Sequence, residues 1–554
     1  MRYAQAEVIA SALEATAREM NAALVRTAYS PNIKERADCS TALTDMQGRT
    51  LTLYTNAPAH LGATLRLVPE ILKRFPLETL RPGDAFMAND PYIVGVTHLN
   101  DCTIASPIFV EDEAVGFAVA VAHHSDVGGR VPGSEAGDST SIYQEGIRFP
   151  PVQIYRAGER RHDVVELFLL NSRTPHFGEG DLLAQLAAVE RGIQRVQELF
   201  ARFGREVMLE RIDQMLESTE ARTRHQIRTN LKDGTYSAED WLDEDGLTDT
   251  PVRLATDITI KDGHIHIDLS RCADQVGSGK NMPWTHTLST VYYCLKVFTE
   301  PDLPINEGLY RCVSVTAPEG SIANCRPPAG VSSRGLTSMI LADCIIAALG
   351  KAAPQKALAP SGTYQGIILS GYDPIRSRYF IDYENFSGGQ GGRVTADGMD
   401  AVQLHMTNTL NLPIEAMEAE FPVQVERYEL LPDTGGRGKY RGGLGVVREL
   451  RILVDGVSLA TRSARQRFPA AGLFGGMPGS LGAFILNPGT PKERKLPSTK
   501  SEISLKKGDL LRIVTPGGGG FGPEAERRPD DAHKDLLSGK VSGENAYLRP
   551  RSAA

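Results

Sequence analysis

Residues 89–148 read NDPYIVGVTHLNDCTIASPIFVEDEAVGFAVAVAHHSDVGGRVPGSEAGDSTSIYQEGIR, and this stretch decides the fold. Its centre, VGFAVAVA at 115–122, consists of small and β-branched residues without charge, which indicates a buried strand. The strand ends abruptly in His-His-Ser-Asp at 123–126, and two glycines follow. Active sites of α/β proteins commonly lie on loops at strand ends. We therefore expect the functional site at this end of the strand.

Four residues of this region and the loop before it are candidate metal ligands. His98 and Asp101 stand three apart in HLND, a spacing that can place both side chains on one side of a turn, and His123 ends the apolar strand. Asp38, from an earlier loop, is the leading candidate to complete a set of two imidazoles and two carboxylates, which suits a divalent ion. Lone histidines are more often structural, so the residues alone leave both readings open.

Two residues beside these candidates are expected to support the metal ligands without binding the metal themselves. His124 and Asp126 can hold a ligating imidazole by its other nitrogen. The thiols of Cys39 and Cys102 each adjoin a carboxylate, which raises a thiol pKa, so we expect buried structural cysteines and not nucleophiles.

Composition excludes several classes of protein. The 554 residues require several domains, and the net charge is −8 without any sustained basic block, which argues against a nucleic-acid surface. No apolar run approaches the length of about 20 residues that spans a bilayer, so no membrane is expected. The seven cysteines are odd in number and contain no CxxC pair, which favours a reducing cytoplasm.

Hydrophobic patterning predicts a multi-domain protein of mixed α/β or α+β class with mixed sheets. We expect a helix over 5–28, a hairpin near 39–55, further helices at 288–299 and 338–349, and a strand- and glycine-rich C-terminal half. Long helix is expected near 181–230, with Gly192 and Gly204 as breaks or tolerated interior positions. The expected regions are a metal-site α/β region (1–180), a helical segment (181–232), a mixed α/β region (233–374), a β- and glycine-rich region (375–525) and a polar C-terminal tail (526–554).

No motif predicts that this chain binds ATP by itself. The sequence Gly-Ser-Gly-Lys at 277–280 resembles the end of a P-loop but lacks the following Ser or Thr and the upstream glycine spacing. The run GGGGFG at 517–522 could form an anion-binding nest, although a plain flexible turn is favoured.

Phrases spread along nearly the whole chain resemble the hydantoinase B/oxoprolinase family. They include NIKERADCS (32–40), PGDAFMANDPY (82–92), THLNDCTIASP (97–107), AHHSDVGGRVPGS (122–134), QEGIRFPP (144–151), ENFSGGQGG (384–392), NLPIEAMEAEFP (411–422) and TPGGGGFG (515–522). The resemblance implies a B subunit with one divalent metal ion, which works in a hetero-oligomer with a hydantoinase A-type subunit. That partner binds ATP and phosphorylates the substrate. Ring-opening members hydrolyse cyclic amides such as hydantoins, oxoproline or lactams, and related enzymes carboxylate acetone or acetophenone.

The resemblance also places the site residues. Metal ligands are implied at Asp38, His98, Asp101 and His123, for zinc, manganese or iron. The sequence departs from the family at IVGVTH (93–98), where relatives usually have Gly-Gly before Thr-His, so Val96 is expected to reshape the approach to the metal.

Three residues are candidates for the general base or for the proton donor to the leaving nitrogen: His124, Asp126 and Glu145. His124 is the first choice, provided that the strand breaks before it, since neighbouring residues of a strand point to opposite faces. Three functions stay open: an ATP-dependent cyclic-amide hydrolase, a subunit of an ATP-dependent ketone carboxylase, and a non-catalytic scaffold subunit.

Overall fold

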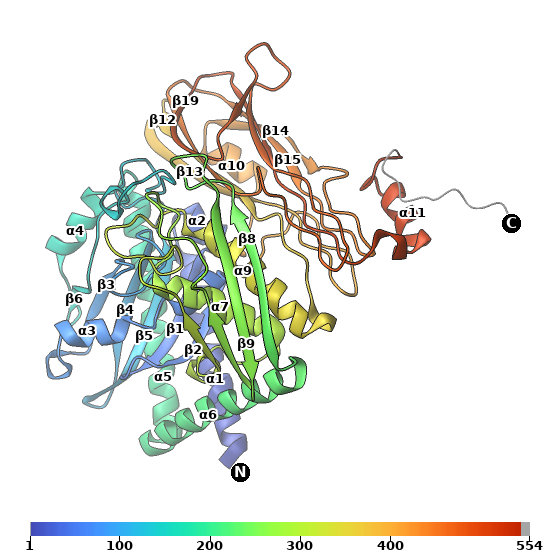
Figure 1. Ribbon diagram of the computed structural model, residues 1–554. Coiled ribbons are helices and arrows are strands. Elements are labelled where there is room, and N and C mark those ends of the chain that lie inside the picture. Colours follow the sequence, from blue (N-terminus) through green and yellow to red (C-terminus); the bar gives the residue numbers. More distant parts are fainter. Residues whose placement is uncertain (1, 544–554) are drawn as a thin grey trace. The chain divides into compact units, whose positions relative to one another are not determined.

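The computed structural model describes residues 2–543 (Figure 1). It divides into two compact units. The first unit comprises Met1–Thr235, Ile258–Ser338 and Met406–Leu410, and the second comprises Tyr236–Asp257, Met339–His405 and Asn411–Ala554.

A seven-stranded sheet with the order β2-β1-β5-β4-β3-β6-β7 forms the centre of the first unit. Its strands are β1 (Cys39–Asp45), β2 (Thr50–Thr55), β3 (Ala85–Ala88), β4 (Asp101–Val110), β5 (Glu113–His123), β6 (Val152–Arg156) and β7 (Glu159–Arg160). Each neighbouring pair is antiparallel. The predicted hairpin near 39–55 and the buried strand over 115–122 are confirmed, and β5 is buried on both faces from Gly116 onward.

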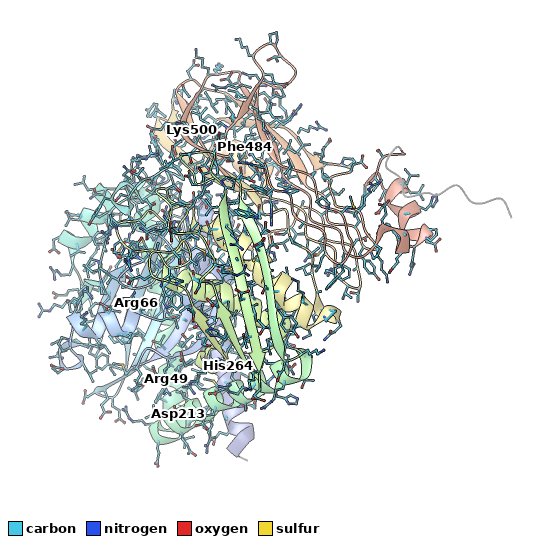
Figure 2. All side chains as sticks on the ribbon, viewed as in Figure 1. Arg49, Arg66, Asp213, His264, Phe484 and Lys500 are labelled. Carbon is cyan, nitrogen blue, oxygen red and sulfur yellow. The ribbon has the colours of Figure 1, made fainter. Side chains whose placement is uncertain are left out.

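Helices α1 (Arg2–Thr27) and α5 (Pro175–Phe203) lie side by side on this sheet (Figure 1). Gly192 lies inside α5 and does not break the helix. A Cβ there would lie 2.5 Å from the sulfur of Met20 on α1, so glycine lets the two helices pack closely. Gly204 has φ +79° and ends α5, after which α6 (Arg205–Asn230) begins. Figure 2 shows Arg49, from the turn of the β1–β2 hairpin, beside Asp213 of α6, and the two form an ion pair of 2.9 Å.

The remaining elements of the first unit are mostly short. They are α2 (Pro31–Lys34), η1 (Pro58–Gly62), α3 (Leu67–Arg74), η2 (Leu77–Thr79), η3 (Ile142–Gln144), α4 (His162–Leu170), α7 (Trp284–Phe298), α8 (Glu307–Tyr310), β10 (His264–Asp268) and β11 (Val313–Thr316). Strand β10 pairs in parallel with β11 in a sheet of the order β11-β10-β9-β8. Strands β8 (Gly234–Leu242) and β9 (Val252–Lys261) of that sheet have residues in both units.

The second unit is built on two further sheets, with the orders β13-β12-β16-β19 and β14-β15-β20-β17-β18. Their strands are β12 (Tyr364–Asp373), β13 (Arg378–Ser387), β14 (Val423–Leu430), β15 (Val446–Ile452), β16 (Val457–Ser463), β17 (Ala483–Leu486), β18 (Arg494–Leu496), β19 (Thr499–Leu505) and β20 (Leu510–Val514). Phe484, labelled in Figure 2, is fully buried in the apolar core of this unit. Helix α10 (Ile414–Glu420) contributes Met417 to the same core.

The glycines at 517–520 form neither an anion nest nor a flexible turn, so both readings of that run are wrong. The backbone N–H groups of Gly518, Gly519 and Gly520 donate to carbonyl oxygens of other segments over 2.8–3.0 Å, which leaves these groups unavailable to an anion. The segment is buried, and a Cβ at Gly519 would lie 1.9 Å from the carbonyl oxygen of Ala471. Glycine is required here because neighbouring backbones touch.

Three further expectations bear on class and compartment. Six of the seven cysteines, all among the described residues, are buried, and Cys272 is half-buried. Helix α9 (Arg334–Ala352) is long and apolar enough to cross a membrane, but 83% of that stretch is buried inside the protein, as in a core helix. The polar tail expected from 526 contains helix α11 (Pro529–Leu537), and its last residues, 544–554, lie outside the described residues.

Candidate metal centre

Two neighbouring strand ends and the loops beside them build one buried cluster. Asp101, the first residue of β4, is the register partner of His123, the last residue of β5. His98 lies in the loop just before β4, and its carbonyl accepts a hydrogen bond of 3.2 Å from the Asp101 N–H. Asn100 pins this loop by donating from its side chain to the carbonyls of His124 and Gly133.

The side chains of His98, Asp101 and His123 meet there, together with Glu135. His98 Nε2 lies 3.3 Å from Asp101 Oδ1, and its Nδ1 lies 3.2 Å from Glu135 Oε1. His123 Nε2 lies 3.1 Å from the same Glu135 oxygen. One ligand atom each from His98, His123 and Glu135 lies within 4.8 Å of the other two. Ligand atoms about 2.05 Å from a tetrahedral ion are about 3.3 Å apart, so these separations match a metal-binding group.

Unsatisfied atoms in this cluster fit a cation. Within the described part of the chain, both ring nitrogens of His98 and the Oδ1 atom of Asp101 are buried without a hydrogen-bond partner of good geometry. Buried polar atoms in native proteins are nearly always satisfied. Burial, and then the charge of Arg334, lower the pKa of His98 well below its usual value. Burial opposes ionisation of Asp101, but its contacts with His98 and His60 hold the pKa of Asp101 well below its usual value. A neutral imidazole beside an ionised carboxylate is the protonation state that binds a divalent ion.

The loop after β5 brings Glu135 into the cluster. Asp126 Oδ1 accepts hydrogen bonds from Ser134 Oγ (2.9 Å) and the Gly133 N–H (3.2 Å), which fold the loop back on itself. Ser134 Oγ also accepts from the N–H groups of Val127 and Gly129, each over 3.0 Å. Asp126 therefore acts through Ser134 to hold Glu135, which is fully buried.

Asn32 determines which ring nitrogen of His123 carries the proton. Arg36 donates to Asn32 Oδ1 over 2.8 Å, so the Asn32 amide N–H donates to His123 Nδ1 over 3.2 Å. The proton of a neutral His123 then lies on Nε2 and points to Glu135. An ion at Nε2 would need that proton moved to Nδ1 and the amide of Asn32 turned over.

Arg334 is the cationic side chain of the cluster. Its guanidinium donates two hydrogen bonds to Thr97 Oγ1, over 3.0 and 2.7 Å, and Thr97 in turn donates to Asp101 Oδ2. Arg334 nitrogens lie 3.6 Å from Asp101 and 3.8 Å from Glu135. Two carboxylates therefore face one guanidinium in a buried site, which leaves negative charge for a cation to neutralise.

Two more imidazoles border the cluster. His60, from η1, has its Nε2 atom 3.5 Å from Asp101 Oδ1. His286, in the first turn of α7, is fully buried, and within the described residues neither of its ring nitrogens has a hydrogen-bond partner. Burial, and then Arg334, lower the pKa of His286 well below its usual value.

Asp38, the fourth predicted ligand, reaches the site through its backbone. Its carbonyl accepts from the His123 N–H over 3.1 Å, and its side chain is half-buried. The carboxylate beside His98 and His123 is that of Glu135, so a ligand role for the Asp38 side chain stays a prediction. Val96 is fully buried next to this loop.

The predicted base His124 faces away from the cluster. Its Nε2 atom lies 3.0 Å from Gln185 Oε1 on α5, and its ring packs edge-on against Phe168. Gln185 also donates to the carbonyls of Cys102 and Ala120, which fixes its amide so that Oε1 accepts from His124. The strand therefore does not turn His124 into the site, and a catalytic role for it stays a prediction.

Glu145, the other predicted acid or base, is buried where the loop over 331–332 meets it. Its Oε1 accepts from the N–H groups of Val331 (2.8 Å) and Ser332 (3.0 Å), and among the described residues its Oε2 has no hydrogen-bond partner. Burial raises the pKa of Glu145 to about 8, so the group is largely protonated at neutral pH.

The two thiols beside the carboxylates are buried, as predicted. Burial, and then Asp38, raise the pKa of Cys39 to about 12. Burial, and then Asp101, raise the pKa of Cys102 well above its usual value.

Sequence reasoning missed four members of the cluster: His60, Glu135, His286 and Arg334. Glu135 directly follows the recognised phrase that ends in Ser134, and its place after a tight turn beside the predicted ligands was a usable signal. His286 and Arg334 lie far along the chain, and no spacing connects them with His98.

Comparisons with known proteins identify the family of this chain. The family Hydantoinase B/oxoprolinase matches residues 3–524. An uncharacterized protein of Methanocaldococcus jannaschii is 35% identical over 548 residues, which cover 98% of this chain and 94% of that protein. The caprolactamase subunit beta of Pseudomonas jessenii is 31% identical over 552 residues, or 98% of this chain and 94% of its own.

Solved structures support the fold. The crystal structure of the ATP-dependent caprolactamase from Pseudomonas jessenii matches with a TM-score of 0.88 at 29% identity, over 98% of this chain and 95% of that one. A nucleotide-free acetone carboxylase matches with a TM-score of 0.90 at 19% identity, over 97% of this chain and 78% of that one, which shows a shared fold alone. The chain belongs to the hydantoinase B/oxoprolinase family.

Proposed function

We propose that this chain is the metal-containing B subunit of an ATP-dependent hydrolase of cyclic amides. The observation that carries the proposal is the buried convergence of His98, His123 and Glu135, whose ligand atoms lie within 4.8 Å of one another, with Asp101 3.3 Å from the other ring nitrogen of His98. The similarity to the caprolactamase subunit beta of Pseudomonas jessenii supports the substrate class and a second, A-type subunit.

The chemistry of the substrate explains why two subunits would act in sequence. An unstrained cyclic amide resists water because resonance stabilises its C–N bond. Transfer of the γ-phosphoryl group of ATP to the amide oxygen by the partner subunit would remove that resonance. Hydroxide would then add to the carbon, and the ring nitrogen would take up a proton as the C–N bond breaks, which gives a ring-opened acyl phosphate. A second water would cleave this acyl phosphate to the carboxylate and inorganic phosphate.

The residues of this chain would hold the metal ion and balance the charge of the carboxylates around it. His98, Asp101, His123 and Glu135 would hold a divalent ion, which lowers the pKa of bound water and so supplies hydroxide near neutral pH. Arg334 would offset the second carboxylate and keep Asp101 in place through Thr97. Of the three predicted acid–base residues, Glu145 is the best suited to give a proton, because it is protonated near neutral pH and its Oε2 is uncommitted within the described residues.

Reconstitution with an A-type subunit tests the proposal. The two chains are incubated with ATP and with hydantoin, 5-oxoproline or caprolactam, and phosphate release is compared with ring-opened product. We expect product only when both chains and ATP are present, and loss of product with Asp101→Asn. Product that carries a new carboxylate and requires bicarbonate would instead identify a ketone carboxylase. Full activity of Asp101→Asn would identify a scaffold subunit.

A further inference from the structure

The loop between β5 and η3 carries Glu135 and folds around one carboxylate, that of Asp126. The Asp126 side chain is fully buried, and its Oδ1 atom accepts hydrogen bonds from Ser134 Oγ and the Gly133 N–H. Ser134 has φ +61°, in the left-handed region, and stands directly before Glu135. A residue with a side chain keeps that conformation only where its surroundings hold it there. The direction in which the chain delivers Glu135 to the metal-binding group therefore depends on the hydrogen bonds of Asp126.

Arg173, in the turn between α4 and α5, holds this carboxylate from outside the loop. Its backbone N–H donates to Asp126 Oδ2 over 2.7 Å, and its Nη1 atom donates to both carboxylate oxygens over 3.0 and 3.2 Å. Its Nη2 atom donates to the Gly129 carbonyl over 2.6 Å. Charge-assisted hydrogen bonds of this kind are roughly twice as strong as neutral ones. One guanidinium thus joins Asp126 to the middle of the loop.

The turn that carries Arg173 also packs directly on the loop. Gly128 has φ +81°, and a Cβ there would lie 2.4 Å from the Asn171 carbonyl oxygen. On its other side the loop is held by the Arg130 N–H, which donates to the Gln144 carbonyl over 2.7 Å. The loop is therefore fixed on two sides, and Arg173 supplies the contact to the buried carboxylate.

Arg173 is reachable from solvent, whereas the groups that it holds are not. Its side chain is 31% exposed, that of Asp126 is 0% exposed, and Glu135 is fully buried. Loss of the guanidinium would leave Asp126 as a buried carboxylate without its cation, which is strongly unfavourable. The loop would have to open to let water reach Asp126, and Glu135 would move with it.

We propose that Arg173 is a positioning residue of the metal centre, which acts through Asp126 and Ser134 to hold the Glu135 carboxylate against the two ligating imidazoles. The inference rests on the proposed divalent ion. It makes the affinity of a buried centre depend on a side chain at the molecular surface, in a turn that no sequence spacing connects with the ligands.

Metal binding by the purified full chain tests this inference without any activity assay. The affinity for Zn²⁺ is measured by competition with a chelator, and the visible spectrum is recorded with Co²⁺, for the wild type, Arg173→Ala, Arg173→Lys and the control Arg160→Ala. Arg160, on β7, is a matched control because its side chain is 24% exposed and forms an ion pair of 2.8 Å with Glu179. We expect Arg173→Ala to weaken Zn²⁺ binding about 10-fold and to change the Co²⁺ spectrum, Arg173→Lys to restore part of the affinity, and Arg160→Ala to leave both unchanged.

A double-mutant cycle separates positioning from a general loss of stability. If Arg173 acts through Glu135, Arg173→Ala should weaken Zn²⁺ binding by less than about 2-fold in a Glu135→Gln background, because the carboxylate that it positions is already gone. An undiminished loss in that background would overturn the inference.

The outcomes also separate this inference from the proposed function. If the wild type binds neither ion, the proposed function fails and this inference falls with it. If the wild type binds and Arg173→Ala matches it in affinity and spectrum, the inference about Arg173 fails alone. Should Arg173→Ala not fold, as judged by circular dichroism, Arg173→Gln takes its place, and an affinity equal to that of the wild type overturns the inference.

Discussion

Asp101 and His123 face each other across the β4–β5 ladder as the first residue of one strand and the last residue of the next. Register partners of an antiparallel pair project to the same face of the sheet at a fixed spacing. The sheet, and not a loop, therefore sets the position of both side chains. Loops then bring His98 and Glu135 to this fixed edge.

The carboxylate that completes the metal-binding group can be identified by comparing Glu135→Gln with Asp38→Asn. Glu135 Oε1 lies 3.2 and 3.1 Å from His98 and His123, whereas Asp38 approaches His123 through its backbone. We expect Glu135→Gln to weaken Zn²⁺ binding more than about 10-fold and Asp38→Asn to have the smaller effect. Chelator competition gives both affinities, and the reverse order would restore Asp38 as the ligand.

Asn32→Asp is expected to strengthen metal binding. A carboxylate at this position would accept a proton from His123 Nδ1 and leave Nε2 free, as in the carboxylate–histidine–metal arrangement. The new charge would also pair with Arg36. We expect the Zn²⁺ affinity to rise about 10-fold. An affinity no higher than that of Asn32→Leu would show that the tautomer of His123 is not limiting.

Replacement of Arg334 by Met should make the folded protein depend on metal. The change leaves Asp101 and Glu135 without their guanidinium and costs about 3 kcal/mol of stability in the metal-free protein. A divalent ion takes over the neutralisation, so Zn²⁺ should raise the melting temperature of Arg334→Met more than that of the wild type. Thermal unfolding with EDTA and with Zn²⁺ measures both shifts, and equal shifts would contradict the electrostatic role.

Glu145 makes stability depend on pH. Burial raises its pKa from about 4.5 to about 8 in the folded chain, so the folded protein keeps a proton that the unfolded chain releases between these values. This contribution is complete below about pH 4.5 and is lost as the pH rises through about 8. The free energy of unfolding of the wild type should fall by about 3 kcal/mol more than that of Glu145→Gln between about pH 5.5 and about pH 8.5.

Urea titrations at the two pH values measure this difference, with the exposed Glu111→Gln as the control. A wild type whose stability changes in parallel with that of Glu145→Gln would show that Glu145 is ionised in the fold throughout this range.

His124→Ala should lower stability without loss of metal. The ring fills space against Phe168 and donates to Gln185, so its removal costs about 2 kcal/mol. Metal analysis should give the wild-type content. Lost metal with unchanged stability would place His124 in the centre after all.

The sequence predicts much of this arrangement because some signals are local. An uncharged run ending in two histidines locates β5 and the site edge, and helix-forming composition locates α5 and α6. Which face a side chain takes depends on where the strand ends, and for this reason His124 was expected in the site although it packs on α5.

Tertiary packing decides the rest. Asp126 was expected beside an imidazole, but the loop closes on Ser134 and uses Asp126 to hold Glu135. Arg334 reaches Asp101 and Glu135 from the start of α9, and no pattern within the sequence measures that distance.

The glycines at 517–520 set a limit on how this region can change. A methyl group at Gly517 would lie 1.8 Å from the carbonyl oxygen of Thr434, and one at Gly518 would lie 2.1 Å from that of Gln390. Even alanine would force apart segments that are held together by main-chain hydrogen bonds. In a saturation mutagenesis library only glycine should be accepted at these four positions, whatever the substrate used for selection.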